Sequence, residues 1–316
     1  MSSALVIASQ MTESFNAGLR MKVDATVIAA PEECPWVAAN DADIMLVRPT
    51  SAWTDNRDLA RPAAWPGRLK WVYSGTTGID FYPRWLLDAP VVTCGRGIAS
   101  DQIADYVMAA IYLQAKDLEA VRVHAPSQWK TRPLGRMAGS TVGLLGFGAI
   151  GTAVARRALA AGVRVTAVRR RKLPSPVDGV ELLDQLEDVV ASADHLVLAL
   201  PATDSTRLVI DAAMLGYARP GAHLINVGRG AVLDHEALID ALDAGRLGFA
   251  TLDVTEPEPL PEGHRLWTHD RVRLTPHVSA NHTDVHAVLL ERVAANIDRF
   301  VRGEALVDIV DKIAGY

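Results

Sequence analysis

The sequence predicts an α/β fold with parallel sheets arranged in two domains. Short apolar runs typical of strands alternate with helical segments from one end of the chain to the other, which is the pattern of consecutive βα units. The chain has 316 residues, a length that favours two domains. Apolar residues make up 49% and charged residues 22% of the chain, an ordinary balance for a globular protein with a sizeable core.

The first third of the chain contains five short apolar runs separated by segments rich in Pro, Trp and Asp. These runs are predicted strands at residues 5–8, 27–29, 44–47, 71–73 and 91–93. A long amphipathic helix is predicted next, from Asp101 to about His124, with Ser100 as its N-cap. Because this helix is longer than a local crossover needs, we expect it to serve as an interdomain spacer or an oligomer contact.

A second series of βα units follows. Its strands are predicted at residues 142–145, 164–168, 195–200, 222–226, 249–253 and 272–274, with a helix over 152–161 after the first of them. The last predicted helix covers about residues 283–302. If this helix returns to pack on the first domain, that domain is built from both ends of the chain.

Composition argues against several classes of function. The net charge of −5 offers no basic footprint for nucleic acid. No apolar run approaches the ~20 residues of a membrane span, and no basic region precedes the first apolar stretch as in a signal peptide. Cys34 and Cys94 form neither a disulfide framework nor a metal-site pattern. We therefore expect a cytoplasmic protein without a metal, a nucleic-acid partner or a membrane partner.

A glycine-rich turn predicts a dinucleotide cofactor. Gly146, Gly148 and Gly151 form a GxGxxG motif with Ala149 and Ile150 between them. The motif alone is a weak signal, but here an apolar strand precedes it and a helix follows. Glycines in this setting allow a tight turn and close backbone approach, so that a pyrophosphate can lie on the helix N-terminus.

The end of the following strand indicates which dinucleotide is preferred. NAD-binding units place an Asp or Glu there, ~20 residues beyond the glycines, to accept from the ribose 2′-hydroxyl. This chain instead has Arg169, Arg170 and Arg171. Guanidinium groups bind a 2′-phosphate bidentately, so NADP is predicted to be preferred, with NAD still possible. The alternative is a solvated basic turn.

Three polar residues follow predicted strands of the second series. Arg229 stands between two glycines after the strand at 222–226, Glu258 follows the strand at 249–253, and His277 ends the run that begins at Val272. In an open α/β sheet, ligands bind outside the carboxyl ends of the strands. A cation, a carboxylate and an imidazole at three such ends are the parts needed for acid–base chemistry on a small anion.

The ordered motifs resemble those of the D-isomer-specific 2-hydroxyacid dehydrogenase family, and within it the glyoxylate/hydroxypyruvate reductases. The resemblance covers essentially the whole chain. Its motifs are Gly75-Thr-Thr-Gly-Ile-Asp80, Ala104-Asp-Tyr106, Gly146 to Gly151, Leu200-Pro-Ala-Thr203 with Thr206, Ile225-Asn-Val-Gly-Arg-Gly-Ala231, Leu252-Asp-Val-Thr-Glu-Pro-Glu-Pro-Leu260 and Thr275-Pro-His277.

The resemblance implies two Rossmann-like domains, with the dinucleotide-binding domain inserted into a discontinuous substrate domain. The expected substrate-binding domain comprises residues 1–99 and 284–316, and the expected dinucleotide-binding domain comprises 100–283. The implied activity is hydride transfer from NADPH to a small 2-keto acid such as glyoxylate or hydroxypyruvate, which yields the D-2-hydroxy acid. The implied assembly is a homodimer formed through the region of the long helix, residues 101–124.

The resemblance also implies residue roles. His277 is expected to be the general acid, Glu258 to hydrogen-bond its imidazole, and Arg229 to hold the carboxylate and carbonyl of the substrate. The same carboxylate is expected to lie against backbone N–H groups near Thr76, Thr77 and Gly78, with Arg48 as a further substrate contact. Beyond the glycine and arginine motifs, the expected cofactor contacts are Thr77, Pro201, Thr206, Val227, Gly228 and, against the nicotinamide carboxamide, Asp253.

Some positions depart from the family pattern. Thr76 and Thr77 replace a usual Gly-Ala, Asp105 replaces Glu, Thr255 replaces an aromatic residue, and Arg265 replaces proline. The threonines and Arg265 lie where substrate size is read, so the exact substrate stays open.

Alternative functions on the same fold are an NAD-linked dehydrogenase of another 2-hydroxy acid, a formate dehydrogenase and a non-enzymatic dinucleotide-sensing corepressor. Formate dehydrogenases carry Gln at the position of Glu258, because hydride loss from formate needs no proton relay, so this Glu argues against that activity. A corepressor is expected to carry long low-complexity tails, which this sequence lacks.

Overall fold

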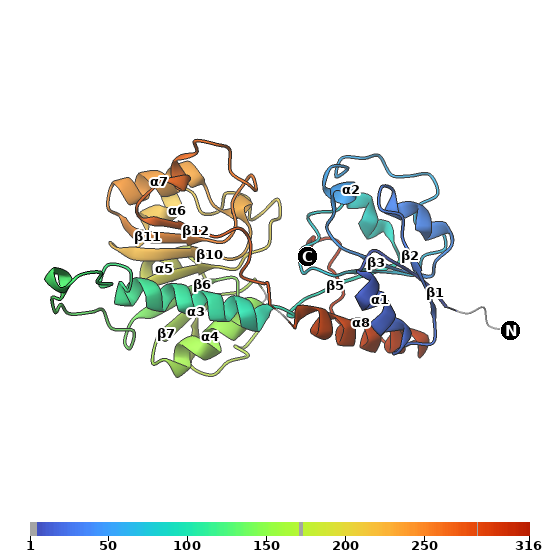
Figure 1. Cartoon of the computed structure of the whole chain (residues 1–316), viewed down its shortest axis with the longest axis horizontal. Helices are drawn as coiled ribbons and strands as arrows, with labels where there is room; N and C mark the ends of the chain where they lie inside the picture. Colours follow the sequence, from blue (N-terminus) through green and yellow to red (C-terminus); the bar gives the residue numbers. More distant parts are fainter. Residues whose placement is uncertain (1–4, 171–172, 283) are drawn as a thin grey trace. The chain divides into compact units, whose positions relative to one another are not determined.

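The computed structural model describes residues 5–170, 173–282 and 284–316. The chain divides into two compact units. The first unit combines Met1–Ile98 with His282–Tyr316, and the second unit is Ala99–Asn281. The two ends of the chain therefore belong to one unit, and the second unit is inserted between them (Figure 1).

The first unit contains a parallel sheet of five described strands in the order β2-β1-β3-β4-β5. Their bounds are Val6–Ser9 for β1, Thr26–Ala29 for β2, Ile44–Val47 for β3, Trp71–Ser74 for β4 and Val91–Cys94 for β5. The shorter elements are α1 (Glu13–Arg20), α2 (Ser51–Thr54), η1 (Pro35–Asn40) and η2 (Arg84–Asp88).

The last helix, α8 (Val285–Val301), packs on the sheet of the first unit beside α1 (Figure 1). Leu289 and Val293 of α8 share an apolar core with Ile7 of β1 and Leu19 of α1. On the other face, the indoles of Trp53, Trp65 and Trp85 belong to a second core. The first predicted position of the last helix, residue 283, lies outside the described residues.

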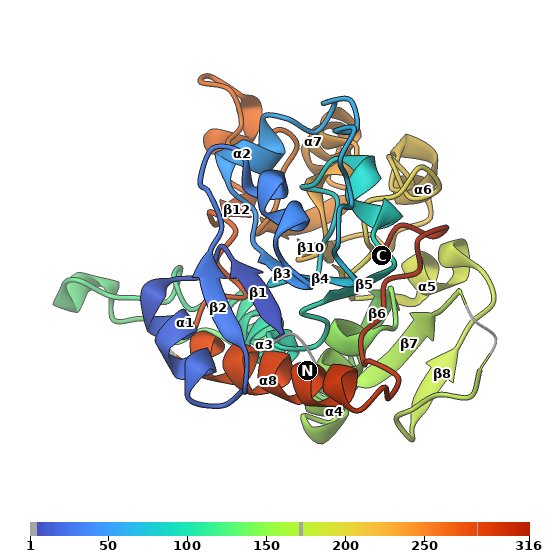
Figure 2. The ribbon, with the colours of Figure 1, turned by 90° about the vertical axis from the view of Figure 1, so that its right-hand side faces the viewer.

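The second unit contains a parallel sheet of seven described strands in the order β12-β11-β10-β9-β6-β7-β8. Their bounds are Thr141–Leu145 for β6, Arg164–Val168 for β7, Val180–Leu182 for β8, His195–Leu198 for β9, Ala222–Asn226 for β10, Leu247–Leu252 for β11 and Val272–Leu274 for β12. Figure 2 shows β7 and β8 at one edge of this sheet.

Helices cover both faces of this sheet (Figure 1). One core contains side chains of α3 (Ser100–Lys116) and α4 (Ala149–Ala160), and the other contains those of α5 (Leu186–Ser192), α6 (Ala212–Gly216) and α7 (His235–Asp243). Single-turn helices occur at η3 (Pro126–Gln128), η4 (Gly230–Val232) and η5 (Arg265–Trp267). Parallel strands buried on both faces explain why the sequence shows continuous apolar runs.

The long helix predicted from Asp101 to His124 is shorter than expected. Ser100 is its first residue, with Ala99 as the N-cap, and not the cap itself. The helix ends at Lys116, because Asp117 adopts the left-handed conformation with φ of 47°. The side chains of Leu118 and Val123 beyond it are exposed. Without a surface on which to bury them, the apolar periodicity does not extend the helix.

Further differences concern the strands. The strand expected over 195–200 ends at Leu198, the strand expected over 249–253 begins at Leu247 and ends at Leu252, and β8 was not predicted. None of the helices in the described part of the chain is long and apolar enough to cross a membrane. The same described ranges contain no cluster of three His, Cys, Asp or Glu side chains arranged to hold a metal ion.

Candidate active site

The glycine-rich turn joins β6 to α4 in the second unit. Gly146 has φ of +101°, and a β-carbon there would come within 2.6 Å of the Ala199 carbonyl oxygen. Glycine is therefore required for the turn. Gly148 is the N-cap of α4, and a β-carbon on it would meet no atom within 4 Å. Open space thus lies before the first turn of a twelve-residue helix, whose N–H groups and dipole favour a phosphate.

The basic turn follows β7, the strand next to β6 in the sheet. The guanidinium of Arg169 donates through Nη1 to the Pro174 carbonyl oxygen at 2.9 Å, and its side chain is half-buried. Arg170 is exposed. Arg171 lies outside the described residues. The described arginines stand at the carboxyl end of β7, where NAD-binding units of this type of fold place an acidic residue.

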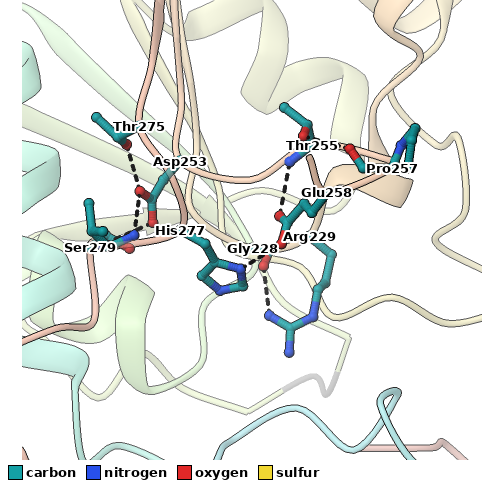
Figure 3. A network of polar contacts seen from close by, with 10 residues as sticks. Gly228, Arg229, Asp253, Thr255, Pro257, Glu258, Thr275, His277 and Ser279 are labelled. Atoms are coloured by element: carbon teal, nitrogen blue, oxygen red, sulfur yellow. Dashed lines mark hydrogen bonds and ion pairs between the residues drawn. The ribbon is translucent and has the colours of Figure 1, made fainter. Parts of the chain in front are cut away.

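Arg229 lies in the loop after β10, which begins at Val227. Its Nη1 donates to the Gly228 carbonyl oxygen at 2.9 Å (Figure 3). A β-carbon on Gly230 would lie 1.9 Å from the carbonyl carbon of Thr255, which no side chain can tolerate. Glycine at 230 therefore lets the loop of Arg229 pass directly against the loop that carries Glu258.

His277 and Glu258 form the central pair of the site. The imidazole Nδ1 of His277 and Oε2 of Glu258 are 2.9 Å apart, while Oε1 of Glu258 accepts from the Thr255 N–H at 3.1 Å (Figure 3). The side chains of His277 and Glu258 remain 36% and 40% exposed, so both are accessible to a small molecule. Three residues predicted from separate strand ends are thus held together in one loop cluster.

The electrostatics of this cluster favour an ionised Glu258. Burial opposes the charged form, but the hydrogen bond and charge of His277, the Thr255 N–H and the positive charge of Arg229 outweigh it. The pKa of the Glu258 carboxyl is therefore lowered from its ordinary value. A carboxylate can only accept, so the Nδ1 of His277 must carry the hydrogen. Its Nε2 is then the nitrogen available to exchange a proton.

Asp253 is buried beneath this pair, with a side chain that is 2% exposed. Its Oδ1 accepts from the Thr275 hydroxyl at 2.6 Å and from the Val278 N–H at 2.9 Å, and its Oδ2 accepts from the Ser279 N–H at 2.9 Å. These contacts tie the carboxylate to the chain on both sides of His277 (Figure 3). Thr275 belongs to a motif that the sequence singles out, yet nothing in the sequence pairs it with Asp253.

The remaining predicted cofactor residues of the second unit follow β9 and β10. The hydroxyl of Thr206 donates to the Pro201 carbonyl oxygen at 2.6 Å and accepts from the Thr203 N–H at 2.9 Å, which closes the loop after β9. The Gly228 N–H donates to the Asn226 side-chain oxygen at 3.1 Å, which orders the turn after Val227. These loops leave the same edge of the sheet as the glycine-rich turn, because all its strands are parallel.

The predicted substrate residues of the first unit also follow parallel strands. Arg48 comes after β3, and its Nε donates to the Gln10 carbonyl oxygen at 2.8 Å. The loop after β4 is shaped by threonine hydroxyls: that of Thr76 donates to the Gly78 carbonyl oxygen at 2.9 Å, and that of Thr77 donates to the Gly95 carbonyl oxygen at 3.0 Å. These residues gather at the carboxyl edge of the first unit's own sheet.

Comparison with known proteins identifies the family. Residues 108–279 match the family model described as D-isomer specific 2-hydroxyacid dehydrogenase, NAD binding domain. A glyoxylate/hydroxypyruvate reductase A of Serratia proteamaculans is 31% identical over 320 residues, which cover 96% of each chain. This chain belongs to the D-isomer specific 2-hydroxyacid dehydrogenase family. The resemblance inferred from the sequence motifs is thereby confirmed.

Solved structures of family members agree along the whole length. A D-isomer specific 2-hydroxyacid dehydrogenase of Xanthobacter autotrophicus, solved with NADPH and MES, has a TM-score of 0.83, 27% identity and full coverage of both chains. An NADPH-dependent glyoxylate/hydroxypyruvate reductase of Sinorhizobium meliloti, solved with NADP and sulfate, has a TM-score of 0.80 and 28% identity, with 99% of this chain and 100% of that chain covered.

Family membership establishes the fold and the general activity. The predicted fold of two Rossmann-like domains with parallel sheets is confirmed. The protein is a D-2-hydroxyacid dehydrogenase that uses a nicotinamide dinucleotide. Its substrate is a small 2-hydroxy or 2-keto acid.

Proposed function

We propose that this dehydrogenase reduces a small 2-keto acid of the glyoxylate or hydroxypyruvate type with NADPH and forms the D-2-hydroxy acid. The observation that carries the proposal is the pair of His277 and Glu258, 2.9 Å apart, in the loop cluster that also contains Arg229. Relatives named glyoxylate/hydroxypyruvate reductase support the substrate class. His277, Glu258 and Arg229 are the proposed catalytic residues.

In this mechanism the protein binds the substrate anion and delivers a proton. When bound, the dinucleotide would supply the hydride for the keto carbon. Arg229 holds the substrate carboxylate and polarises the carbonyl oxygen through its planar fork. His277 gives the proton on Nε2 to that oxygen as the alkoxide develops, and in the reverse direction it takes the proton back. Glu258 stabilises the charged imidazole and fixes its orientation.

The glycine-rich turn and the loops around it are the proposed cofactor contacts. Gly146, Gly148 and Gly151, together with Ala149 and Ile150, would cradle the pyrophosphate at the N-terminus of α4. Pro201, Thr206, Val227 and Gly228 would line the rest of the dinucleotide from the loops after β9 and β10.

The preference for NADPH rests on the arginines after β7. Arg169 and Arg170 would bind the 2′-phosphate, and hydrogen bonds to charged groups contribute roughly 1.5–3 kcal/mol each. Two such contacts, partly screened, would favour NADPH by roughly one to two orders of magnitude. Two related structures were solved with NADPH or NADP bound, which supports this choice.

Steady-state kinetics with both cofactors test the proposal. A panel of 2-keto acids is crossed with NADPH and NADH, using wild type, Arg169→Asp and, as a charge-matched control at an exposed site, Arg207→Asp. Wild type should prefer NADPH with glyoxylate or hydroxypyruvate, and Arg169→Asp should invert the cofactor preference. Better use of NADH by wild type would mean that the basic turn is only a solvated loop.

Substrate size would be read by the first unit. The backbone N–H groups near Thr76, Thr77 and Gly78 would bind the carboxylate, and Arg48, anchored on Gln10, would contact the rest of the molecule. Arg48→Ala is expected to raise the KM for hydroxypyruvate more than that for glyoxylate, because only the former extends beyond the keto group. Equal changes for the two substrates would exclude Arg48 from the site.

A homodimer in the cytoplasm completes the proposal. Residues 117–136 extend from the end of α3 (Figure 1), and all of them except Val121 are exposed. They carry Leu118, Trp129 and Leu134, whose exposure would be relieved in an interface. Analytical ultracentrifugation should give the mass of two chains, and Trp129→Glu should weaken the association. Both cysteines are unpaired, as expected in a reducing compartment.

A further inference from the structure

We propose that Tyr106 and Thr275 are positioning residues for His277, which act by fixing the carboxylate of Asp253. The proposal rests on the acid–base role proposed for His277. The three side chains form a continuous hydrogen-bonded chain from α3 to the loop after β12. The Tyr106 and Thr275 hydroxyl oxygens are 2.7 Å apart, and the Thr275 oxygen lies 2.6 Å from Oδ1 of Asp253.

The direction of this chain follows from counting protons. An ionised carboxylate only accepts, so the single hydroxyl proton of Thr275 is given to Asp253. The contact between Thr275 and Tyr106 then needs its proton from Tyr106. Burial, opposed by the Thr275 contact and reinforced by the Asp253 charge, raises the pKa of the Tyr106 phenol above its ordinary value. Tyr106 therefore remains a donor at any working pH.

The two oxygens of the Asp253 carboxylate accept different numbers of hydrogen bonds. Its Oδ1 accepts from both the Thr275 hydroxyl and the Val278 N–H, which uses both of its lone pairs. Its Oδ2 accepts from the Ser279 N–H and has no second donor within residues 5–170, 173–282 and 284–316, which leaves one lone pair there. One oxygen is thus committed to the protein, and the other can still take a further donor such as a carboxamide. Fixing Oδ1 fixes the orientation of the whole group.

The Asp253 carboxylate stabilises the strained backbone at His277, the proposed general acid. His277 has φ of 51°, in the left-handed region that residues with a β-carbon seldom adopt. Its N–H points back to the Asp253 and Thr275 carbonyl oxygens at 2.9 and 3.0 Å. The next two N–H groups, of Val278 and Ser279, are both taken by the Asp253 carboxylate.

Strain of this kind persists only when the surrounding contacts fix it. The chain from Tyr106 links the conformation of His277 to α3, a helix whose residues Ile103, Val107 and Ile111 are anchored in the core. Loss of the Thr275 hydroxyl would leave Oδ1 of Asp253 short of a donor and bury an unpaired phenol proton. Asp253 would then reorient, and the imidazole would leave its place beside Glu258. A displacement of about 1 Å at a catalytic group can cost roughly 100-fold in rate.

The test compares Thr275→Val, which removes only the hydroxyl, with Thr275→Ser, which retains it. Thr275→Val is expected to lower kcat roughly 10-fold to 100-fold with the KM for the keto acid little changed, and Thr275→Ser should recover kcat to within about threefold of wild type. Tyr106→Phe should show the same pattern with a smaller loss. It also serves as the second variant if Thr275→Val does not fold.

A matched control separates positioning from general destabilisation. Thr251 lies in β11 of the same sheet, is fully buried, and bonds His223 through its hydroxyl at 2.9 Å. Thr251→Val therefore removes a comparable buried hydrogen bond away from His277, and kcat should stay near wild type. The affinity for NADPH, measured by fluorescence titration, should fall by a smaller factor than kcat does in Thr275→Val, because Asp253 is only one of the proposed cofactor contacts.

A second readout does not depend on turnover. In protein labelled with ¹⁵N-histidine, the imidazole signals of His277 should shift in Thr275→Val and Tyr106→Phe, but not in Thr251→Val. If wild type reduced no 2-keto acid, the proposed function would fail while this spectrum still tested the positioning. The inference is overturned if His277 signals are unmoved, if Thr275→Val loses no more kcat than Thr251→Val, or if its only defect is cofactor affinity.

Discussion

His277 follows a strand and His223 lies within a strand of the same unit, and their imidazoles have opposite surroundings. The ring of His277 follows β12 at the carboxyl edge, is about one-third exposed and faces the Glu258 carboxylate. The ring of His223 lies within β10 and is 2% exposed. One nitrogen of His223 contacts the Thr251 hydroxyl, and its Nδ1 meets no hydrogen-bond partner among the described residues.

The difference shows how a fold divides one residue type between chemistry and packing. Burial, with the nearby His195 and Arg273 adding to it, lowers the pKa of His223 to about 3. That ring is neutral at any working pH and packs edge-on against His195 and Phe249. His277, with an anionic partner and access to solvent, can hold either a proton or a lone pair on Nε2. Only the environment of His277 suits proton transfer.

The largest expected effect comes from removing the accessible imidazole. His277→Ala should lower kcat for 2-keto acid reduction by roughly 10²–10⁴-fold, the usual contribution of a positioned general acid. His223→Gln is the matched control, because it deletes an imidazole of the same unit that is remote from solvent, and its kcat should remain within about threefold of wild type. Comparable losses in both variants would erase the proposed division of roles.

The next effect comes from the partner of that imidazole. Glu258→Gln keeps the shape of the side chain but removes the charge that stabilises imidazolium. A hydrogen bond to a charged group contributes roughly 1.5–3 kcal/mol, so kcat should fall roughly 10-fold to 100-fold. The pH profile of reduction should move toward lower pH, because the protonated ring loses its anionic neighbour. The profile is measured as kcat against pH, and an unmoved profile would contradict this role.

The wild-type pH profile also has a predicted acid limit. The pKa of Glu258 is lowered from its ordinary 4.5, so the carboxyl group stays ionised above pH 4.5. It loses its negative charge only as the pH falls below that value. Reduction by wild type should therefore show no loss from Glu258 titration between pH 5 and pH 7. The contrary outcome is a wild-type kcat that falls between pH 7 and pH 5 while that of Glu258→Gln does not. This result would show Glu258 taking up a proton in that interval and would contradict its pairing with His277.

A smaller effect is expected at Arg229, which is proposed to bind the substrate carboxylate. Arg229→Lys keeps the charge but loses the planar fork, so the KM for the keto acid should rise and kcat should fall together. The combined loss in kcat/KM should be about tenfold or more. NADPH affinity should barely change, and fluorescence titration checks this. If the variant weakened only NADPH binding, Arg229 would belong to the dinucleotide site.

The buried ring should affect stability and not turnover. Because the pKa of His223 is lowered from 6.5 to about 3, the unfolded chain binds more protons below pH 6.5. The contribution of the neutral His223 ring to the free energy of unfolding is complete above pH 6.5, and it is lost as the pH falls toward 3. At pH 5 the loss amounts to about 2 kcal/mol. Urea unfolding at pH 7 and pH 5 should show a smaller difference for His223→Gln than for wild type.

Strands were the part of the fold most readable from sequence. Short runs rich in apolar residues predicted β3, β7, β10 and β12 with the bounds that the structure shows. β3 and β10 are buried at every residue, so composition alone marks them, whereas β7 is exposed at Arg164 and β12 is partly exposed throughout. β8, which has three residues at a sheet edge, gave no such signal. The end of α3 was misplaced because Asp117 turns left-handed while the apolar period continues.

The site was readable for a different reason. Strand ends in a parallel sheet share one edge, so the order of strands and polar residues along the sequence is enough to expect Arg229, Glu258 and His277 near one another. Their roles remain predictions. The chain from Tyr106 to Asp253 could not be anticipated, because it joins residues 169 and 22 positions apart through side-chain geometry. Such contacts depend on how α3 packs on the sheet, which no local pattern encodes.

The most direct measurement follows turnover in both directions against pH. The central claim is that His277 gives a proton in reduction and takes one in oxidation. Initial rates of 2-keto acid reduction with NADPH and of 2-hydroxy acid oxidation with NADP are measured on wild type between pH 5 and pH 10. We expect kcat for reduction to fall, and kcat for oxidation to rise, as the pH increases through the same range. Rates that change in the same sense in both directions would contradict the account.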